Sequence, residues 1–288
     1  MNMKSDPPRA LGILAGGGAL PFQVAAAAQA AGRPVFVVGL EGFVDLARLP
    51  PWPHDVIRMG AMGRIRAVLR QHACQDVVLI GPVRRPSLRD IRPDAEGAKI
   101  LARIGRAVFA GDDGLLKAVI RVIGEEGFRV LGAHEIFQEA LAPRGLLTQA
   151  APDAAAMADI TRGVAVARAL GAVDVGQGCV VQQGFVLAVE AIEGTDAMLR
   201  RCAALARSAP GGVLVKVAKP GQDRRVDLPA LGPDTVTAAV AAGLRGIAFE
   251  AGGALLIERA ATIAAADKAG LFLLGLDPDQ FNPGSSPS

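Results

Sequence analysis

Residues 10–39 read ALGILAGGGALPFQVAAAAQAAGRPVFVVG, and the order of segments in this stretch sets the architecture of the first half of the chain. A short apolar run ends in three glycines, Gly16, Gly17 and Gly18. Pro21 then opens an alanine-rich segment, and proline is favoured in the first turn of a helix. A second apolar run, residues 34–39, follows. Strand, glycine loop, helix and strand in this order predict the start of a doubly wound parallel sheet.

The glycine loop also indicates contact with phosphate or sugar. Glycines let backbone N–H groups approach an anion at a helix N-terminus. The dinucleotide fingerprint asks for a third glycine where this chain has Pro21. Pro21 therefore argues against NAD as the ligand of this loop. A tight turn without any ligand is the alternative.

The next strong strand signal is the apolar run DVVLIG at 76–81, which is typical of a buried parallel strand. It ends at Gly81, and ligands bind beyond the carboxyl ends of such strands. The residues that follow are basic: Arg84, Arg85, Arg89, Arg92, Lys99, Arg103 and Arg106. They suit substrate phosphates or an anionic lipid surface, with a solvated face as the alternative. Asp112 and Asp113 precede an apolar run and are candidates for a helix N-cap or a ligand contact.

Composition excludes several classes of protein. The net charge is only +3 and aromatic residues make up 4% of 288 residues, which argues against a nucleic-acid partner. Three cysteines without a CxxC pair fit a reducing cytoplasm and argue against a thiolate zinc site. The sequence contains no charge-free apolar run of about 18 residues, so we expect no membrane span.

The change in pattern along the chain predicts two domains. We expect a Rossmann-like domain over residues 1–133, a linker over 134–158, a C-terminal catalytic α/β domain over 159–277 and a tail over 278–288. The linker is placed by the loop-like composition of ALAPRGLLTQAAP at 140–152.

Two apolar runs in the second half each end in a dense set of polar side chains. The run at 185–189 leads to Glu190, Glu193, Thr195 and Asp196. The run at 213–217 leads to Lys216, Lys219, Gln222, Asp223 and Asp227. Carboxylates, amides and lysines at the ends of buried strands suit a hard metal ion and an anionic substrate. Surface turns with solvated charges are the alternative, and Thr195 or Asp196 is also a candidate helix cap.

These motifs together resemble one family. They are DVGQ at 174–177, EAIEGTD at 190–196, the segment 216–229 and GPDT at 232–235 in the second half. GILAGGGALP at 12–21 and DDGLL at 112–116 match in the first half. The chain resembles, over residues 10–275, the bacterial UDP-2,3-diacylglucosamine pyrophosphatases of lipid A biosynthesis. Two unrelated types of enzyme have this activity, and the chain resembles the type that is not a calcineurin-like metallophosphoesterase.

The resemblance implies a Rossmann-like domain and a distinct C-terminal α/β domain with the ligand between them. It also implies Mg²⁺-dependent hydrolysis of UDP-2,3-diacylglucosamine to UMP and 2,3-diacylglucosamine 1-phosphate. The expected catalytic residues are Asp223, Asp227, Gln222 and Lys216, and the expected metal ligands are Asp223, Asp227 and Glu190. The expected substrate-binding residues are Gly16, Gly17, Gly18, Gly81, Asp112, Asp113, Gln177, Glu190, Gly194, Thr195, Asp196 and Lys219.

The partners follow from that chemistry. We expect a lipid-linked nucleotide-sugar substrate and a cytoplasmic enzyme held peripherally at the inner membrane, and the long linker is compatible with a domain-exchanged homodimer. Two rival functions are a nicotinamide-dependent oxidoreductase and a non-catalytic protein that binds nucleotide-sugars or lipids. Pro21, and the lack of a clear Tyr-Lys or His-Asp pair for hydride transfer, speak against the oxidoreductase.

Overall fold

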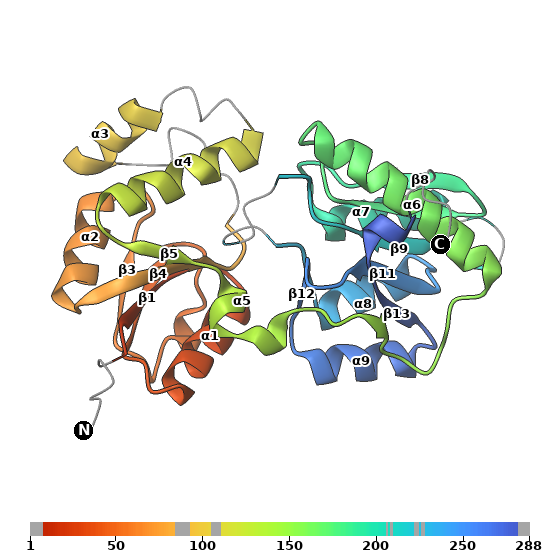
Figure 1. Cartoon of the computed structure of the whole chain (residues 1–288), viewed down its shortest axis with the longest axis horizontal. Helices are drawn as coiled ribbons and strands as arrows, with labels where there is room; N and C mark the ends of the chain where they lie inside the picture. Colours follow the sequence, from red (N-terminus) through yellow and green to blue (C-terminus); the bar gives the residue numbers. More distant parts are fainter. Residues whose placement is uncertain are drawn as a thin grey trace, which may run out of the picture. The chain divides into compact units, whose positions relative to one another are not determined.

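The chain folds into two compact units, coloured from red to blue along the sequence in Figure 1. The computed structural model describes residues 8–83, 93–104, 111–205, 207, 210–221, 225 and 228–281. The first unit consists of Met1–Gln138 together with Asp223–Val226, and the second of Glu139–Gln222 with Asp227–Ser288. The main boundary, between residues 138 and 139, lies within the predicted linker, but the first unit also takes in a short stretch from far along the chain.

The first unit is built on a five-stranded parallel sheet in the order β3-β2-β1-β4-β5. Its strands are β1 (Ala10–Ala15), β2 (Val35–Leu40), β3 (His54–Ile57), β4 (Cys74–Ile80) and β5 (Arg129–Leu131). The order reverses between β1 and β4, which makes their carboxyl ends the point where such sheets bind ligands. The doubly wound parallel sheet predicted from residues 10–39 is confirmed.

Helices cover both faces of this sheet (Figure 1). They are α1 (Leu20–Ala30), α2 (Met62–Gln71), α3 (Ala95–Ile104), α4 (Gly111–Glu125) and the single turn α5 (Ala133–Ile136). Ile65 of α2 and Ile120 of α4 pack into one cluster with Val38 and Val77 of the strands, while α1 lies on the opposite face. An N-cap residue precedes the first helical residue, but α4 begins at Gly111 and so already includes Asp112 and Asp113. The expectation that one of them is the N-cap of this helix is therefore wrong.

The second unit contains a mixed six-stranded sheet in the order β6-β13-β11-β9-β7-β8, and a separate short pair, β10 with β12. The strands are β6 (Gly145–Leu146), β7 (Gly178–Gln182), β8 (Phe185–Val189), β9 (Val213–Lys216), β10 (Ala230–Leu231), β11 (Gly246–Glu250), β12 (Leu255–Leu256) and β13 (Phe272–Leu276). Strands β9, β11 and β13 are parallel, and β7 is antiparallel to both β9 and β8. The carboxyl ends of β8, β9, β11 and β13 therefore share one edge with the amino end of β7.

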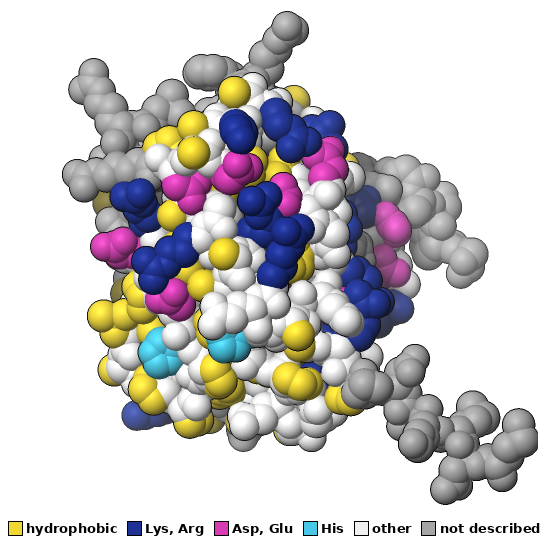
Figure 2. Space-filling view, turned by 90° about the vertical axis from the view of Figure 1, so that its left-hand side faces the viewer, with side chains coloured by type: hydrophobic (Ala, Val, Ile, Leu, Met, Phe, Trp, Pro, Cys, Tyr) yellow, Lys and Arg dark blue, Asp and Glu magenta, His cyan; other side chains and the backbone are white. Residues whose placement is uncertain are grey.

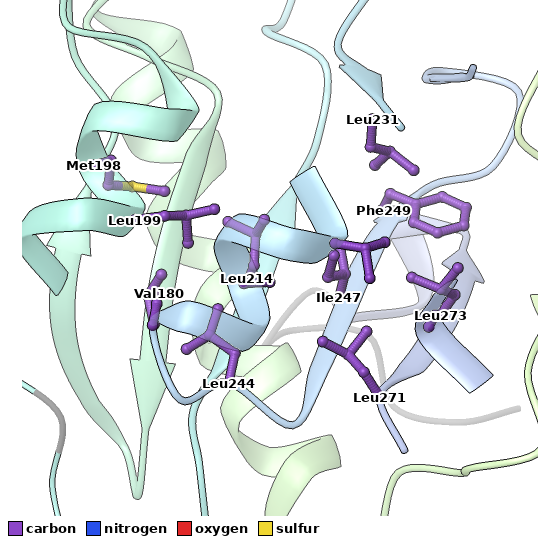
Figure 3. Close-up of a cluster of buried hydrophobic side chains, with 14 of the residues drawn as sticks. Val180, Met198, Leu199, Leu214, Leu231, Leu244, Ile247, Phe249, Leu271 and Leu273 are labelled. Carbon is purple, nitrogen blue, oxygen red and sulfur yellow. The ribbon is translucent and has the colours of Figure 1, made fainter. Parts of the chain in front are cut away.

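Helices sandwich this second sheet, with α6 (Ala154–Ala172) on one face and α7 (Thr195–Cys202), α8 (Pro233–Ala241) and α9 (Arg259–Lys268) on the other. Figure 3 shows Met198 and Leu199 of α7 beside Val180 and Leu214 of the strands. Cys179 and Val215, their neighbours in sequence, face α6 instead, because successive side chains of a strand point to opposite faces. Burial on both faces explains why these strands read as continuous apolar runs.

Short 3-10 turns complete the described elements, at Leu46–Arg48, Gln138–Ala140, Ala203–Leu205 and Pro278–Phe281.

A buried acid fixes the β7–β8 hairpin, which carries part of the polar cluster described below. The carboxylate of Asp159 in α6 is 3% exposed and accepts hydrogen bonds from the amides of Gln183, at 3.0 Å, and Gly184, at 2.7 Å. Both turn residues have positive φ, at 54° and 78°, as a two-residue hairpin turn requires. The hairpin then pairs Cys179 with Val189, so that Glu190 leaves β8 opposite the amino end of β7.

Candidate functional site

Three predicted site residues meet in one hydrogen-bonded cluster at the shared edge of the second sheet. The hydroxyl of Thr195 donates to Glu190 Oε1 at 2.6 Å, and the ammonium of Lys216 donates to the Thr195 hydroxyl, also at 2.6 Å. Lys216 Nζ lies 3.7 Å from Glu190 Oε1. Glu190 follows β8, Thr195 begins α7 and Lys216 ends β9. We call these three residues the bridged cluster, since the threonine hydroxyl joins the acid to the lysine.

The bridged cluster is buried and has unused hydrogen-bonding capacity. Glu190 is 6% exposed and Lys216 is 3% exposed. Within the described part of the chain, Glu190 Oε2 is buried without a hydrogen-bond partner, although buried polar atoms are usually paired. A Cβ on Gly178 would lie 2.7 Å from that oxygen, so a larger residue at this position would make the carboxylate turn away from its present place.

Thr195 has a different role from the helix cap that its position predicts. The N-cap of α7 is Gly194, with φ 78°, and no side chain caps the helix. Thr195 is the first helical residue, and its hydroxyl turns toward Glu190 and Lys216. The expectation that Thr195 or Asp196 caps this helix is therefore wrong, and Asp196 lies exposed in the first turn.

Lys219 and Gln177 lie near the same edge but outside the bridged cluster. The ammonium of Lys219 pairs with Asp174 at 2.7 Å, next to the C-terminal end of α6. The backbone carbonyl of Gln177 accepts from the Val217 amide at 3.0 Å, while its side-chain Oε1 is buried and has no hydrogen-bond partner in the described ranges. Sequence reasoning placed Asp174 in a motif but gave it no role.

Glu250 is a further acid at this edge that the sequence did not single out. It ends β11, and its carboxylate accepts from the Ala218 amide at 2.9 Å, which ties the segment after β9 to the neighbouring strand. Its position at the carboxyl end of a parallel strand was the available signal.

In the first unit, the predicted glycines bring two strand ends into backbone contact. A Cβ on Gly16 would lie 2.5 Å from the Gly81 carbonyl oxygen, and a Cβ on Gly81 would lie 2.5 Å from that of Gly17. The amides of Gly16 and Gly17 donate to the carbonyls of Ile80 and Pro82. Packing thus requires glycine at positions 16 and 81. Because the amides of Gly16 and Gly17 are used within the fold, the phosphate contact that we predict rests on the amides from Gly18 onward.

The opposite edge of the first sheet holds a buried ion cluster with a structural role. Asp76 is fully buried and pairs with Arg33 at 2.6 Å, with Arg129 at 2.9 Å and with Arg9 at 3.1 Å. Burial alone would raise the pKa of Asp76, but the hydrogen bond and charge of Arg129, helped by Arg33 and Arg9, outweigh it. The pKa of this carboxyl therefore lies below its ordinary 3.8.

Many charged side chains on the described surface of the first unit form ion pairs. Figure 2 shows Lys and Arg side chains intermingled with Asp and Glu on one face of this unit. Arg64 pairs with Asp55, Arg66 with Glu126, Lys99 with Glu96 and Arg103 with Glu125. Of the predicted basic patch, Arg84, Arg85, Arg89, Arg92 and Arg106 lie outside the described residues.

The predicted catalytic residues Gln222, Asp223 and Asp227 also lie outside the described residues, as do the side chains of Asp112 and Asp113. Within the described part of the chain, no three His, Cys, Asp or Glu side chains are grouped as a metal site. The ammonium of Lys216, 3.7 Å from Glu190, would repel a bound cation. Glu190 is therefore better suited to hydrogen bonding than to metal ligation.

Comparison with known proteins gives matches in both halves of the chain. Residues 10–140 match the model of the LpxI N-terminal domain, and residues 143–274 match that of the LpxI C-terminal domain. A curated relative is 46% identical over 278 residues, covering 94% of this chain and 99% of its own. That relative is the UDP-2,3-diacylglucosamine pyrophosphatase LpxI of Caulobacter vibrioides, strain ATCC 19089 / CIP 103742 / CB 15.

Proposed function

Because the chain belongs to the LpxI family, we propose that it hydrolyses the diphosphate of UDP-2,3-diacylglucosamine to UMP and 2,3-diacylglucosamine 1-phosphate, a step of lipid A biosynthesis. The observation that carries the proposal is the 46% identity to a pyrophosphatase of that name along nearly the whole length of both chains. The test is release of UMP from this substrate by the purified protein. Tight binding of the substrate without UMP release would instead support a carrier.

The second unit supports the proposal through its polar sheet edge. A buried acid, hydroxyl and lysine are joined at the ends of β8 and β9, and a lysine–acid pair lies close by. The segment 222–227 continues from the same strand, β9, and carries the two aspartates that we propose for the chemistry. Diphosphate hydrolysis needs a positioned water and charge neutralisation at the phosphoryl oxygens, not a covalent nucleophile.

Dependence on Mg²⁺ is part of the proposal, and it rests on Asp223 and Asp227 rather than on Glu190. Carboxylate oxygens are the ligands that Mg²⁺ prefers, and the ion would neutralise phosphoryl charge and favour deprotonation of a bound water. Treatment with EDTA should abolish UMP release, and added Mg²⁺ should restore it. Full activity in the presence of chelator would refute the metal requirement.

We also propose a cytoplasmic location at the surface of the inner membrane. The proposed substrate carries two acyl chains that partition into a bilayer, and all three cysteines are free and buried, as suits a reducing compartment. Among the described residues, no helix is both long and apolar enough to cross a membrane. Flotation with anionic vesicles tests the surface association, and light scattering tests the homodimer that the connecting segment would allow.

A further inference from the structure

The bridged cluster combines a spare donor and a spare acceptor in one buried place. Lys216 has three N–H donors and uses one on Thr195, at 2.6 Å, with a longer contact of 3.7 Å to Glu190. Glu190 Oε1 accepts from Thr195, whereas Glu190 Oε2 has no hydrogen-bond partner among the described residues. A buried carboxylate oxygen without a hydrogen bond is energetically costly. Its occurrence here indicates that a bound ligand supplies the missing hydrogen-bond donor.

The charge of the bridged cluster indicates what that group is. Lys216 is expected from the sequence to neutralise phosphate, but the buried Glu190 carboxylate already balances its charge. A phosphate would be drawn to the ammonium and repelled by Glu190 Oε2, and the two effects oppose each other at similar distance. A hydroxyl group avoids this conflict, because its oxygen can accept from Lys216 while its proton is donated to Glu190.

We infer that the bridged cluster of Glu190, Thr195 and Lys216 binds a sugar hydroxyl of the substrate, and not its diphosphate. This inference rests on the proposed function for the identity of the substrate. Thr195 acts as a positioning residue, since its hydroxyl holds the lysine and the acid at a fixed separation. The terminal torsion of glutamate is soft, so a small turn of the carboxylate brings Oε2 to the arriving hydroxyl.

The substrate has hydroxyls on its ribose and on its glucosamine, and deoxy analogues distinguish the two sources. We would measure kcat/KM for UDP-2,3-diacylglucosamine and for analogues that each lack one free hydroxyl. In the wild-type protein, one analogue should lose about 10- to 100-fold, as expected for a hydrogen bond to a buried charged group. In Glu190→Gln, the same analogue should lose less than about 3-fold relative to the parent compound, because the carboxylate acceptor is gone.

A matched control, Glu193, lies between Glu190 and Thr195 in the sequence. Glu193→Gln changes an acid that pairs with Arg201 outside the cluster and should keep the wild-type preference among the analogues. Thr195→Ser should retain the preference and Thr195→Val should lose it, which a merely space-filling role would not produce. Glu190→Gln leaves the buried charge of Lys216 without a counterion, which can prevent the variant from folding. In that case the double variant Glu190→Gln/Lys216→Met, which removes both charges, takes the place of the single variant in the experiment.

Two results would overturn the inference. One is an equal loss for every analogue in the wild-type protein and in Glu190→Gln. The other is inhibition by inorganic pyrophosphate that weakens tenfold or more in Lys216→Met and tightens in Glu190→Gln, since this would assign the cluster to phosphate. Failure of the proposed function is distinct, because the wild-type protein would then release no UMP from the parent compound. Calorimetric binding of the parent and its analogues would in that case decide the inference alone.

Discussion

The carboxylate of Asp76 and the guanidinium of Arg129 form two parallel hydrogen bonds, each 2.9 Å long, at the amino end of the first sheet. Arg33 and Arg9 complete the ring around the same buried carboxylate. Such a fork-to-fork pair is both strong and geometrically specific. It joins β4 and β5 to the segments that precede β1 and β2, at the edge away from the glycine loop.

Removing Asp76 should therefore lower the free energy of unfolding of the first unit. Asp76→Ala removes the buried carboxylate that three arginines share. Arg9 and Arg129 are about half exposed and can be solvated, so the expected cost is that of lost hydrogen bonds to a charged group, about 1.5–3 kcal/mol. The single tryptophan, Trp52, lies in this unit, so urea unfolding followed by its fluorescence measures the effect there. The control is Asp45→Ala, which removes an exposed ion pair with Arg48 and should cost less than about 1 kcal/mol for that pair. Asp45 also caps the short turn Leu46–Arg48, and loss of this cap adds a small cost. Similar losses in both variants would contradict a special role for Asp76.

The lowered pKa of Asp76 predicts how this stability depends on pH. A carboxyl whose pKa is lower in the folded protein than in the unfolded chain binds fewer protons when folded, so it stabilises the fold above the unfolded value. That contribution should be constant between about pH 5 and 7 and should fall as the pH drops below about 4, toward the lowered folded pKa. The difference in free energy of unfolding between wild type and Asp76→Asn, measured against pH, should shrink over that acid range. A difference that stays unchanged down to pH 2 would argue against the assignment.

Alanine substitutions at Gly81 and Gly127 can distinguish two costs: the strain of a positive φ, and the steric clash where two strand ends come close. Both glycines have positive φ, at 96° and 90°, which costs a side chain about 1–2 kcal/mol. A Cβ at Gly127 would meet nothing within 4 Å, whereas one at Gly81 would lie 2.5 Å from the Gly17 carbonyl oxygen. Gly81→Ala should thus cost about 1–3 kcal/mol more than Gly127→Ala by Trp52 fluorescence. Equal costs would mean that the strand ends move apart easily.

Asp223 and Asp227 remain the proposed catalytic pair. Asp223→Ala and Asp227→Ala should each fold normally, bind the substrate and lose about 100-fold or more of kcat, as is usual when a group that positions or activates a reacting water is removed. Asp279→Ala, which removes an exposed acid paired with Arg168, is the control and should keep full activity. Near wild-type turnover in both single variants would move the chemistry elsewhere in the chain.

Much of the fold could be predicted because its signals are local. The apolar runs of the first sheet, the glycines at its strand ends and Pro21 at the start of α1 all lie within a few residues of what they specify. The run at 213–217, which contains the parallel strand β9 of the second unit, was recognisable for the same reason.

The site was less predictable, because its contacts join residues that are distant in the sequence. Thr195 precedes a helix and therefore reads as a cap, but Lys216 from β9 and Glu190 from β8 decide where its hydroxyl points. Asp76 reads only as the start of an apolar strand, since its arginine partners are spread from Arg9 to Arg129. The role of Glu250 likewise depends on the pairing of β9 with β11.

The stretch Asp223–Val226 belongs to the first unit, and this has a consequence for how the protein is made. The Cα of Arg225 lies 3.2 Å from where a Cβ of Gly132 would be, at the carboxyl end of β5. A ribosome must therefore synthesise more than half of the second unit before the first can be completed. Folding during synthesis usually proceeds one domain at a time, and here Arg225 can reach its place beside Gly132 only after residues 139–224 have been made. A truncated protein that ends at Gln138 would lack that segment, so separating the halves at their apparent border would leave the first one unfinished.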